Sequence, residues 1–320
     1  MMKPYVIHFA PLQGYTDSVY REAHAQVFGG VETYYTPFVR LEKNGFRNKE
    51  LRDLTPETNT FASLVPQMIA ASPQEFRRIA GLFRESGYLR ADINLGCPFP
   101  MQARQHRGAG ILPYPDEVKA LLETIFEFPE IQFSVKLRLG WNSPDEAQAL
   151  LPFLNKLPLV HLSLHPRIGT QQYKGETNRD AFSRFYDSCT LPLLYNGDIR
   201  TLSDIRSLTG HFPRLKGIML GRGLLSFPWL AMEHVSGTSL TAGEKKEKLS
   251  AFHALLVAGY SSRLEGGEHQ VLDKMKAIWD YLLPDAEKRL RKKVLKSSCL
   301  ADYLEAVRNL IYHIPVTTGR

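Results

Sequence analysis

The sequence is poor in cysteine and has no long apolar run. Cys97, Cys189 and Cys299 are an odd number at wide spacing, which excludes a disulfide framework and any Cys-x-x-Cys metal site. No run of about 18 apolar residues occurs, so we expect no membrane-spanning helix. The first residues show no signal-peptide pattern, and the ten histidines show no metal-ligand spacing. We therefore expect a globular, cytoplasmic protein with no bound metal.

The charge is moderately basic and unevenly distributed. The net charge of +7 permits an anionic partner without requiring one. Residues 241–320 hold 14 Lys and Arg against 10 Asp and Glu, and six cations crowd into Lys288–Lys296. This cluster is either a solvated helix face or a surface that contacts the phosphates of a nucleic acid.

Short β-rich segments alternate with helical patterns over the first 230 residues. We expect strands at Val6–Ala10, Thr33–Pro37, Leu64–Met68, Ala91–Asn94, Phe133–Arg138, Val160–Leu164, Leu191–Tyr195 and Gly217–Leu220. We expect helices at Asp17–Phe28, Pro73–Arg84, Pro115–Phe126, Pro144–Leu154 and Leu202–Leu208. Eight such units in about 230 residues predict an α/β fold, the (β/α)8 TIM barrel.

Two details refine this prediction. Ser72-Pro73 and Ser143-Pro144 each put an N-cap before a proline at the first helical position. A doubly wound sheet is the alternative fold. It usually carries a Gly-rich fingerprint after its first strand, and the sequence from Ala10 to Gly14 is not one.

Past Trp229 the strand pattern stops. Amphipathic helices are expected at Lys245–Tyr260, Val271–Leu283 and Leu300–Ile311. We therefore expect a TIM-barrel catalytic domain over residues 1–235 and a small all-α domain over residues 240–320.

Polar residues follow most of the predicted strands, and the carboxyl ends of barrel strands all face one mouth. Asn196, Gly197 and Asp198 follow strand seven, and Gly221 and Arg222 follow strand eight. Glycines let backbone N–H groups approach a ligand closely, and Arg222 adds a fixed charge. Together these two loops predict an anion site rather than two ordinary tight turns.

Four further residues suggest redox chemistry. Lys136 lies in an apolar strand, so it needs an internal salt bridge or an electron-rich partner such as the N1–C2=O edge of a flavin. Gln67 and Asn94 could hydrogen-bond a ring edge or a base. Cys97, on a turn between Gly96 and Pro98, is either a small buried side chain or a reactive group, a proton donor or a nucleophile. The following segment, Phe99–Leu112, is interpreted as a mobile lid.

The sequence resembles the dihydrouridine synthases, FMN enzymes that reduce uridine in transfer RNA. The resemblance spans residues 10–229 in the family's order and spacing. The segments that match the family's motifs are Ala10 to Asp17, Asp92 to Pro98 with Gly108 to Gly110, Val135 to Trp141, His165 to Arg167 with Tyr173 to Gly175, Asn196 to Ile199, and Gly221 to Gly223 with Pro228 and Trp229. The helical tail matches the family's tRNA-binding domain more loosely.

The resemblance implies a role for each site residue. Cys97 would give a proton to uracil C5 while the reduced flavin gives a hydride to C6, with NADPH as reductant. The flavin would be contacted by Pro11, Leu12, Gln13, Gln67, Lys136 and His165. Its phosphate would be held by Asn196, Gly197, Asp198, Gly221 and Arg222. The flipped-out uridine would be held by Asn94, Arg138, Tyr173 and Arg179. We expect a monomer that binds tRNA.

Some segments depart from the family pattern. Where the family usually has His-Gly-Arg-Thr, this sequence has His165-Pro166-Arg167-Ile168. A family segment with Ala-Asp-Trp is replaced by Thr177-Asn178-Arg179-Asp180, and a basic run in the tail is replaced by Lys274-Met275-Lys276. These elements face the substrate, so the target nucleotide stays open.

Two other functions remain open. One is an FMN barrel oxidoreductase for a small molecule, similar to dihydroorotate or dihydropyrimidine dehydrogenases; the basic helical tail argues against it. The other is a non-catalytic RNA-binding protein on the same barrel. The presence of Cys97, Lys136 and the two phosphate loops argues against that alternative.

Overall fold

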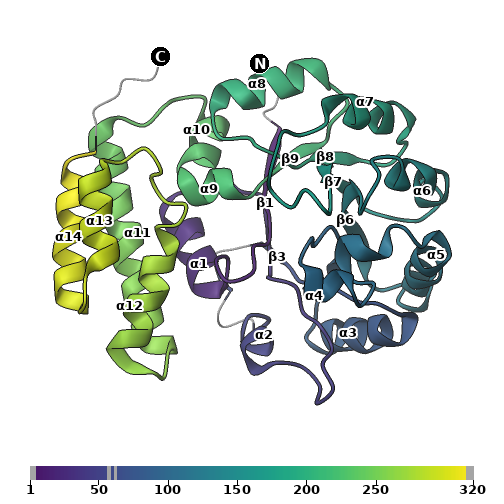
Figure 1. The fold of residues 1–320 in the computed structure, drawn as a ribbon, viewed down its shortest axis with the longest axis horizontal. Coiled ribbons are helices and arrows are strands. Elements are labelled where there is room, and N and C mark those ends of the chain that lie inside the picture. The colour runs from purple at the N-terminus through teal and green to yellow at the C-terminus, as the bar shows by residue number, and fades with distance from the viewer. Residues whose placement is uncertain (1–4, 56–58, 61–62, 315–320) are drawn as a thin grey trace.

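The computed structural model describes residues 5–55, 59–60 and 63–314. Its strands form one parallel sheet, in the order β3-β2-β1-β9-β8-β7-β6-β5-β4. They are β1 (Val6–Phe9), β2 (Thr33–Tyr35), β3 (Leu64–Val65), β4 (Gln67–Met68), β5 (Arg90–Leu95), β6 (Gln132–Gly140), β7 (Leu162–Ile168), β8 (Leu193–Tyr195) and β9 (Gly217–Leu220). Figure 1 shows them at the centre of the larger part of the molecule.

The short strands β3 and β4 are one barrel strand divided at Pro66. Val65 O accepts a hydrogen bond from Thr36 N at 3.2 Å, on the β2 side. Pro66 O accepts one from Asp92 N at 2.9 Å, on the β5 side. The segment therefore joins the two ends of the sheet and closes it. The predicted eight-stranded parallel barrel is confirmed.

Helices surround the barrel and continue beyond it (Figure 1). Those up to the last strand are α1 (Ser18–Val27), α2 (Asn48–Arg52), α3 (Pro73–Glu85), α4 (Pro100–Ala103), α5 (Pro115–Glu123), α6 (Glu146–Leu154), α7 (Arg179–Ser188) and α8 (Leu202–His211), with short 3-10 turns at Gly108–Ile111 and Thr124–Glu127. Those after it are α9 (Arg222–Ser226), α10 (Leu230–Ser236), α11 (Ala242–Arg263), α12 (Gly267–Ile278), α13 (Lys288–Lys296) and α14 (Leu300–Tyr312). Within the described ranges, no helix is both long and apolar enough to cross a membrane.

One of the two predicted helix starts is confirmed and the other is wrong. Ser72 caps α3 by accepting a hydrogen bond from Glu75 N at 3.3 Å. Helix α6 instead begins at Glu146, after Pro144. The Glu146 carboxylate accepts backbone N–H groups of the preceding turn, including Trp141 N at 2.7 Å and Ser143 N at 2.9 Å. We expected Ser143 to cap this helix. Instead, the first residue of the helix, Glu146, accepts the hydrogen bonds of the turn before it.

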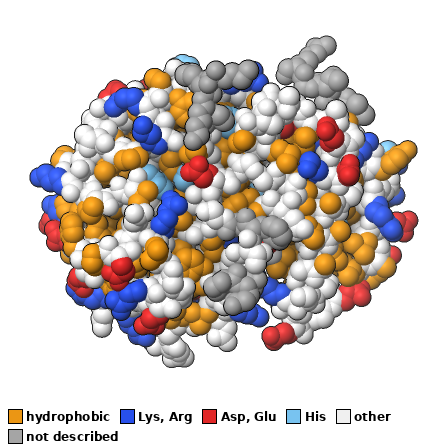
Figure 2. All heavy atoms as spheres, turned by 180° about the vertical axis from the view of Figure 1, so that it is seen from behind, with side chains coloured by type: hydrophobic (Ala, Val, Ile, Leu, Met, Phe, Trp, Pro, Cys, Tyr) orange, Lys and Arg blue, Asp and Glu red, His pale blue; other side chains and the backbone are white. Residues whose placement is uncertain are grey.

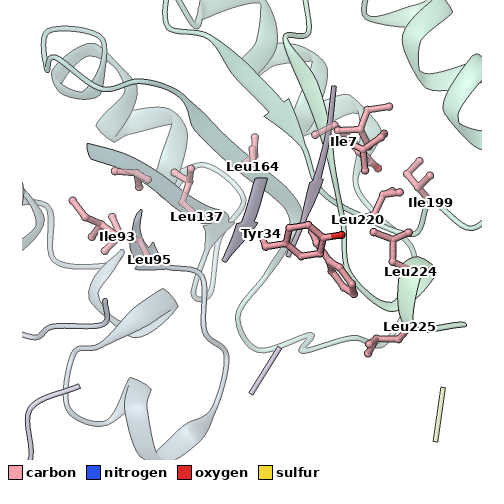
Figure 3. Close-up of a cluster of buried hydrophobic side chains, with 14 of the residues drawn as sticks. Ile7, Tyr34, Ile93, Leu95, Leu137, Leu164, Ile199, Leu220, Leu224 and Leu225 are labelled. Carbon is pink, nitrogen blue, oxygen red and sulfur yellow. The ribbon is translucent and has the colours of Figure 1, made fainter. Parts of the chain in front are cut away.

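The strands of the barrel separate apolar from polar side chains. Ile93 and Leu95 of β5 lie in a buried apolar cluster with Leu137 of β6 and Leu164 of β7 (Figure 3). Because successive side chains of a strand point to opposite faces, Asp92 and Asn94 point the other way. They hydrogen-bond Gln67 of β4, so they lie inside the barrel. This alternation supplies the polar interior from which the site is built.

The C-terminal helices α11 to α14 lie together at the left of Figure 1, where α11 packs against α1. Phe252 of α11 packs against Tyr20 and Phe28: the centroid of its ring lies 5.3 Å from that of Tyr20 and 5.4 Å from that of Phe28. The three predicted tail helices are present, and α13 is a fourth that coincides with the cation cluster. It is short, with Leu290 and Val294 as its buried residues. Figure 2, the opposite face from Figure 1, shows Lys and Arg interspersed with Asp and Glu.

Candidate active site

A pocket of about 660 Å³ opens at the carboxyl ends of the barrel strands. Every predicted site residue lines it except Gln67 and Arg179. Gln67 is fully buried beside it, and Arg179 is exposed in the first turn of α7. The fold therefore brings together side chains that are up to about 210 residues apart in the sequence.

The loops after β8 and β9 form one end of the pocket. Among the described residues, the backbone N–H groups of Gly197, Asp198, Ile199 and Gly221 have no hydrogen-bond acceptor. A Cβ atom at Gly223 would lie 2.1 Å from Ile199 O, so only glycine lets α9 pack this closely on the first loop. Converging free N–H groups are the usual cradle of an anion. The geometry fits the predicted phosphate site.

Asp198 lies in that cradle with an arginine on each side. Its carboxylate accepts a hydrogen bond from Arg222 Nη2 at 2.8 Å and another from Arg167 Nη2. Asp198 has a positive φ of 42°, a conformation that Asp and Asn adopt more readily than most residues. The Asp198 carboxylate would repel a phosphate. The groups of the cradle that suit an anion here are the backbone N–H of Asp198 and the guanidinium of Arg222.

Lys136 lines the pocket as a cation without a partner. No hydrogen bond or ion pair joins its ammonium group to another described residue. Burial, reinforced by Arg138, lowers the pKa of Lys136 to about 8, and Asp92 opposes this shift. An internal salt bridge, the alternative for this residue, is absent from the described part of the chain. An electron-rich ligand atom would satisfy the ammonium group.

A chain of hydrogen bonds runs inside the barrel behind the pocket. Ser134 Oγ and Gln67 Nε2 donate to the two oxygens of Asp92, at 2.6 and 2.7 Å. Gln67 Oε1 accepts from Asn94 Nδ2 at 2.8 Å. Burial raises the pKa of Asp92 to about 6. The amide of Gln67 is therefore used inside the protein, and the residue acts on the pocket through Asn94 rather than by lining it.

Cys97 follows β5 on a turn that Asn94 holds. Asn94 Oδ1 accepts hydrogen bonds from Gly96 N at 2.9 Å and Cys97 N at 2.8 Å. A Cβ atom at Gly108, where φ is +61°, would lie 2.7 Å from Cys97 Cβ. Burial raises the pKa of the Cys97 thiol, so the sulfur is protonated at neutral pH. Cys97 thus presents an S–H group in the pocket.

The rest of the pocket is ordered by backbone contacts. Arg138 donates to the carbonyl oxygens of Gly96, Ile168 and Gln172, at 2.9, 3.0 and 2.6 Å. Its side chain also has a hydrogen-bond interaction with Tyr173. The ring of Tyr173 lies 5.4 Å from the Arg138 guanidinium and 4.6 Å from that of Arg222.

His165 is buried and neutral. Burial and the surrounding cations hold its pKa well below the usual value. Because Arg167 Nη1 must donate across the 3.1 Å contact to His165 Nε2, the proton of the neutral ring is on Nδ1.

Among residues after β1, Gln13 donates through Nε2 to Phe38 O at 3.0 Å, while Pro11 and Leu12 line the wall of the pocket.

The segment from Phe99 to Leu112, which we interpreted as a mobile lid, is partly buried in the structure. It contains α4 and a 3-10 turn, and Ala109 and Ile111 are fully buried. The Phe99 and Met101 side chains are about two-thirds exposed at the pocket rim. The glycines at 108 and 110 therefore permit close packing, since a Cβ at Gly110 would lie 2.4 Å from Ala103 Cα.

Sequence reasoning missed Asp92, Ser134 and Arg167 as site components. Asp92 is two residues from Asn94, Ser134 two from Lys136, and Arg167 two from His165. The two-residue period of a strand puts each pair on one face, so this signal was present. In the described residues, no group of three or more His, Cys, Asp or Glu side chains gathers in a way that could hold a metal ion.

These features define a class: a parallel α/β barrel enzyme whose pocket combines an anion cradle, a buried lysine and a protonated thiol. The chain belongs to the dihydrouridine synthase family, because the family's sequence model, "Dihydrouridine synthase (Dus)", matches residues 8–308. The resemblance found in the motifs is confirmed.

Individual relatives are distant. The chain is 26% identical to a tRNA-dihydrouridine(16) synthase of Aquipseudomonas alcaligenes, over 76% of this chain and 78% of that protein. It is 24% identical to tRNA-dihydrouridine synthase B of Pasteurella multocida, over 70% of this chain and 67% of that one.

Solved structures show the same fold at low identity. An old yellow enzyme from Trypanosoma cruzi has a TM-score of 0.53 at 10% identity, covering 73% of this chain and 89% of that one. An NCR variant from Zymomonas mobilis has a TM-score of 0.51 at 13% identity, covering 73% and 87%. These similarities concern the fold alone.

Proposed function

We propose that this protein reduces uridine to 5,6-dihydrouridine in tRNA, with FMN as resident cofactor and NADPH as the source of electrons. The observation that carries the proposal is the pocket itself, where the protonated Cys97 thiol shares one space with the unpaired Lys136 ammonium and a cradle of free N–H groups. Membership of the dihydrouridine synthase family gives the reaction class.

The cradle suits the phosphate of FMN. Gly197, Ile199 and Gly221 would donate backbone N–H groups, and Arg222 would exchange Asp198 for a phosphate oxygen. Asn196 does not face the phosphate with its side chain, because Nδ2 donates to Met219 O at 2.7 Å. Its role is to tie the ends of β8 and β9 together.

The opposite end of the pocket suits the flavin ring. Lys136 would donate to the ring edge that becomes electron-rich on reduction, and the Nδ1–H of His165 would donate beside it. Pro11 and Leu12 would cover the ring. When bound, the flavin supplies the hydride that is added to uracil C6, at the expense of NADPH.

Cys97 would supply the matching proton. Addition of hydride to C6 leaves negative charge at C5 and O4, and the thiol removes it by transferring its proton to C5. Asn94 has its oxygen committed to two backbone N–H groups and one amide hydrogen committed to Gln67. Its remaining N–H would therefore donate to a uracil carbonyl, and the Arg138 guanidinium would act alongside it.

The helical region at residues 240–320 would bind the RNA backbone. On α13, Lys292, Lys293 and Lys296 are exposed and line a groove of about 500 Å³ between α13 and α14. Arg291 differs, because it donates to the carbonyl oxygens of Leu282, Leu283 and Trp279 and so holds the preceding turn. Arg179, exposed outside the pocket, would contact nucleotides flanking the flipped uridine.

The test uses the purified full-length protein. We expect a yellow protein that releases FMN on heating and that, with NADPH, forms dihydrouridine in tRNA lacking this modification. Free uridine, dihydroorotate and free dihydropyrimidines should be poor substrates. A flavin-loaded protein that turns over a small pyrimidine but not tRNA would support the small-molecule oxidoreductase instead, and a protein without flavin would contradict both.

A further inference from the structure

One wall of the pocket is the loop between β1 and α1. Leu12, Gln13, Gly14 and Tyr15 of this loop line the pocket. The loop contains a turn in which Leu12 O accepts hydrogen bonds from Tyr15 N and Thr16 N, at 3.0 and 3.1 Å. Gly14 has a φ of +87°, which glycine adopts without strain.

Lys274 of α12 contacts the outer side of the loop at two points. Its ammonium group donates to Gly14 O at 2.6 Å and forms an ion pair with Asp17 Oδ2 at 2.8 Å. About a fifth of each side chain of this pair is exposed. The same ammonium lies 5.1 Å from the ring centroid of Tyr260 on α11. A single lysine thus joins the loop to two helices of the tail.

Three other contacts tie neighbouring loop residues to the tail. Tyr15 donates through its hydroxyl to Asp280 Oδ2 at 2.9 Å, and its ring meets that of Tyr281 edge-on at 5.0 Å. Tyr260 donates through its hydroxyl to Asp17 Oδ1 at 2.9 Å. Tyr281 also lines the pocket. The tail is therefore a physical part of the pocket wall, next to the loop that it holds.

We propose that Lys274 is a positioning residue for the pocket, which holds the Gly14 turn against the bound flavin and makes the helical region part of the cofactor site. The ligand named here rests on the proposed function. The geometry supports the role because a charged donor on a backbone carbonyl is stronger than a neutral one, and this one acts on a turn that lines the pocket.

The chain offers a matched control for the test. Lys248 of α11 donates to Val27 O at 3.0 Å, at the end of α1. It is also a lysine that joins the tail to a backbone carbonyl of the barrel, but it is not among the pocket-lining residues or their partners. Lys274→Met and Lys248→Met each remove one positive charge and one hydrogen bond from a tail lysine to a backbone carbonyl of the barrel.

The first measurement is the rate at which flavin leaves the diluted protein, followed by its fluorescence. We expect Lys274→Met to release flavin about tenfold faster than wild type, Lys248→Met to release it at nearly the wild-type rate, and Lys274→Arg to restore slow release. Equal release from Lys274→Met and wild type would overturn the proposal. Equally fast release from both Met variants would overturn it too, because general loosening would explain both.

The second measurement is amide hydrogen exchange of residues 10–17 in flavin-free protein. Exchange should be faster in Lys274→Met and unchanged in Lys248→Met; an unchanged rate in Lys274→Met would overturn the tie itself. If Lys274→Met does not fold, Tyr15→Phe removes the neighbouring tie to Asp280 without changing charge, and the same two measurements apply to it.

Wild-type flavin content and tRNA reduction are measured first. A wild-type protein that fails these assays refutes the proposed function, whereas failure of the variants alone refutes the role of Lys274.

Discussion

Arg222 donates a hydrogen bond to Asp198 at 2.8 Å, across the two loops that close the barrel mouth. The pair lies where a phosphate would bind, so Arg222 is held in place by a carboxylate that an incoming anion must displace. Arg167 contacts the same carboxylate from the other side and gives Asp198 an alternative partner when Arg222 turns to a ligand. The cradle is therefore already formed without a ligand, and the Asp198 carboxylate neutralises part of the positive charge of its arginines.

Arg222→Ala should weaken FMN retention by about 10- to 100-fold, because a hydrogen bond to a charged group is lost. The change is measured as the dissociation constant of FMN by fluorescence quenching. Arg206→Ala, at an exposed arginine of α8, is the matched control and should bind as wild type does. Wild-type affinity in Arg222→Ala would show that the phosphate lies elsewhere.

Asp198→Asn should act in the opposite direction. Asparagine tolerates the positive φ at this position and removes the charge that repels phosphate. We expect FMN to bind about three- to tenfold more tightly in the same titration. Weaker binding would mean that the Asp198 carboxylate is needed to aim Arg222.

Cys97→Ala should keep its flavin and its reduction by NADPH but lose tRNA reduction by about 10²- to 10⁴-fold, the usual contribution of a general acid. Cys97→Ser should be comparably poor, because a serine hydroxyl is a much weaker acid. Stopped-flow flavin oxidation by tRNA separates the two half-reactions.

Cys189 and Cys299 provide the controls for this experiment. Cys189 is buried at the end of α7 and Cys299 precedes α14, both outside the pocket. Their alanine variants should reduce tRNA at nearly the wild-type rate. Full activity in Cys97→Ala would return Cys97 to a packing role.

The affinity for FMN should depend on pH through Lys136. The pKa of this lysine in the free protein is lowered to about 8, so its ammonium form predominates below that pH and is lost above it. A ligand that needs the charged form binds with constant affinity below pH 8 and up to about tenfold more weakly per pH unit above it. Titrations between pH 7 and 9 measure this, and Lys136→Arg should flatten the profile. A wild-type profile with no slope would refute the contact.

Binding of tRNA should weaken steeply with salt, with a log–log slope of about −0.7 to −0.9 per neutralised phosphate. Replacing Lys292, Lys293 and Lys296 with alanine should flatten the slope by about two to three units if each contacts a phosphate. The control replaces three exposed barrel lysines, at positions 119, 156 and 216, and matches the change in net charge. Equal slopes for the two triple variants would make the α13 cluster a solvated helix face.

The sequence by itself determined the barrel and the chemistry at its mouth. Alternation along β5, β6 and β7 fixes which side chains face inward, because the side-chain period of a strand is two whatever its neighbours are. Lys136 and His165 were therefore predictable as site residues from their positions on β6 and β7, and Cys97 from its place on the turn after β5. The two glycine-bearing loops were predictable for the same reason, since parallel strands end at one mouth.

Only the tertiary structure decided which polar groups pair with one another. Gln67 was predicted to contact the flavin, and the register between β4 and β5 sets it opposite Asp92, whose carboxylate accepts a hydrogen bond from its amide. Register depends on closure of the whole barrel, and no local pattern contains it. In the same way, Gly14 and Lys274 are 260 residues apart, and only the packing of α11 on α1 brings them into contact.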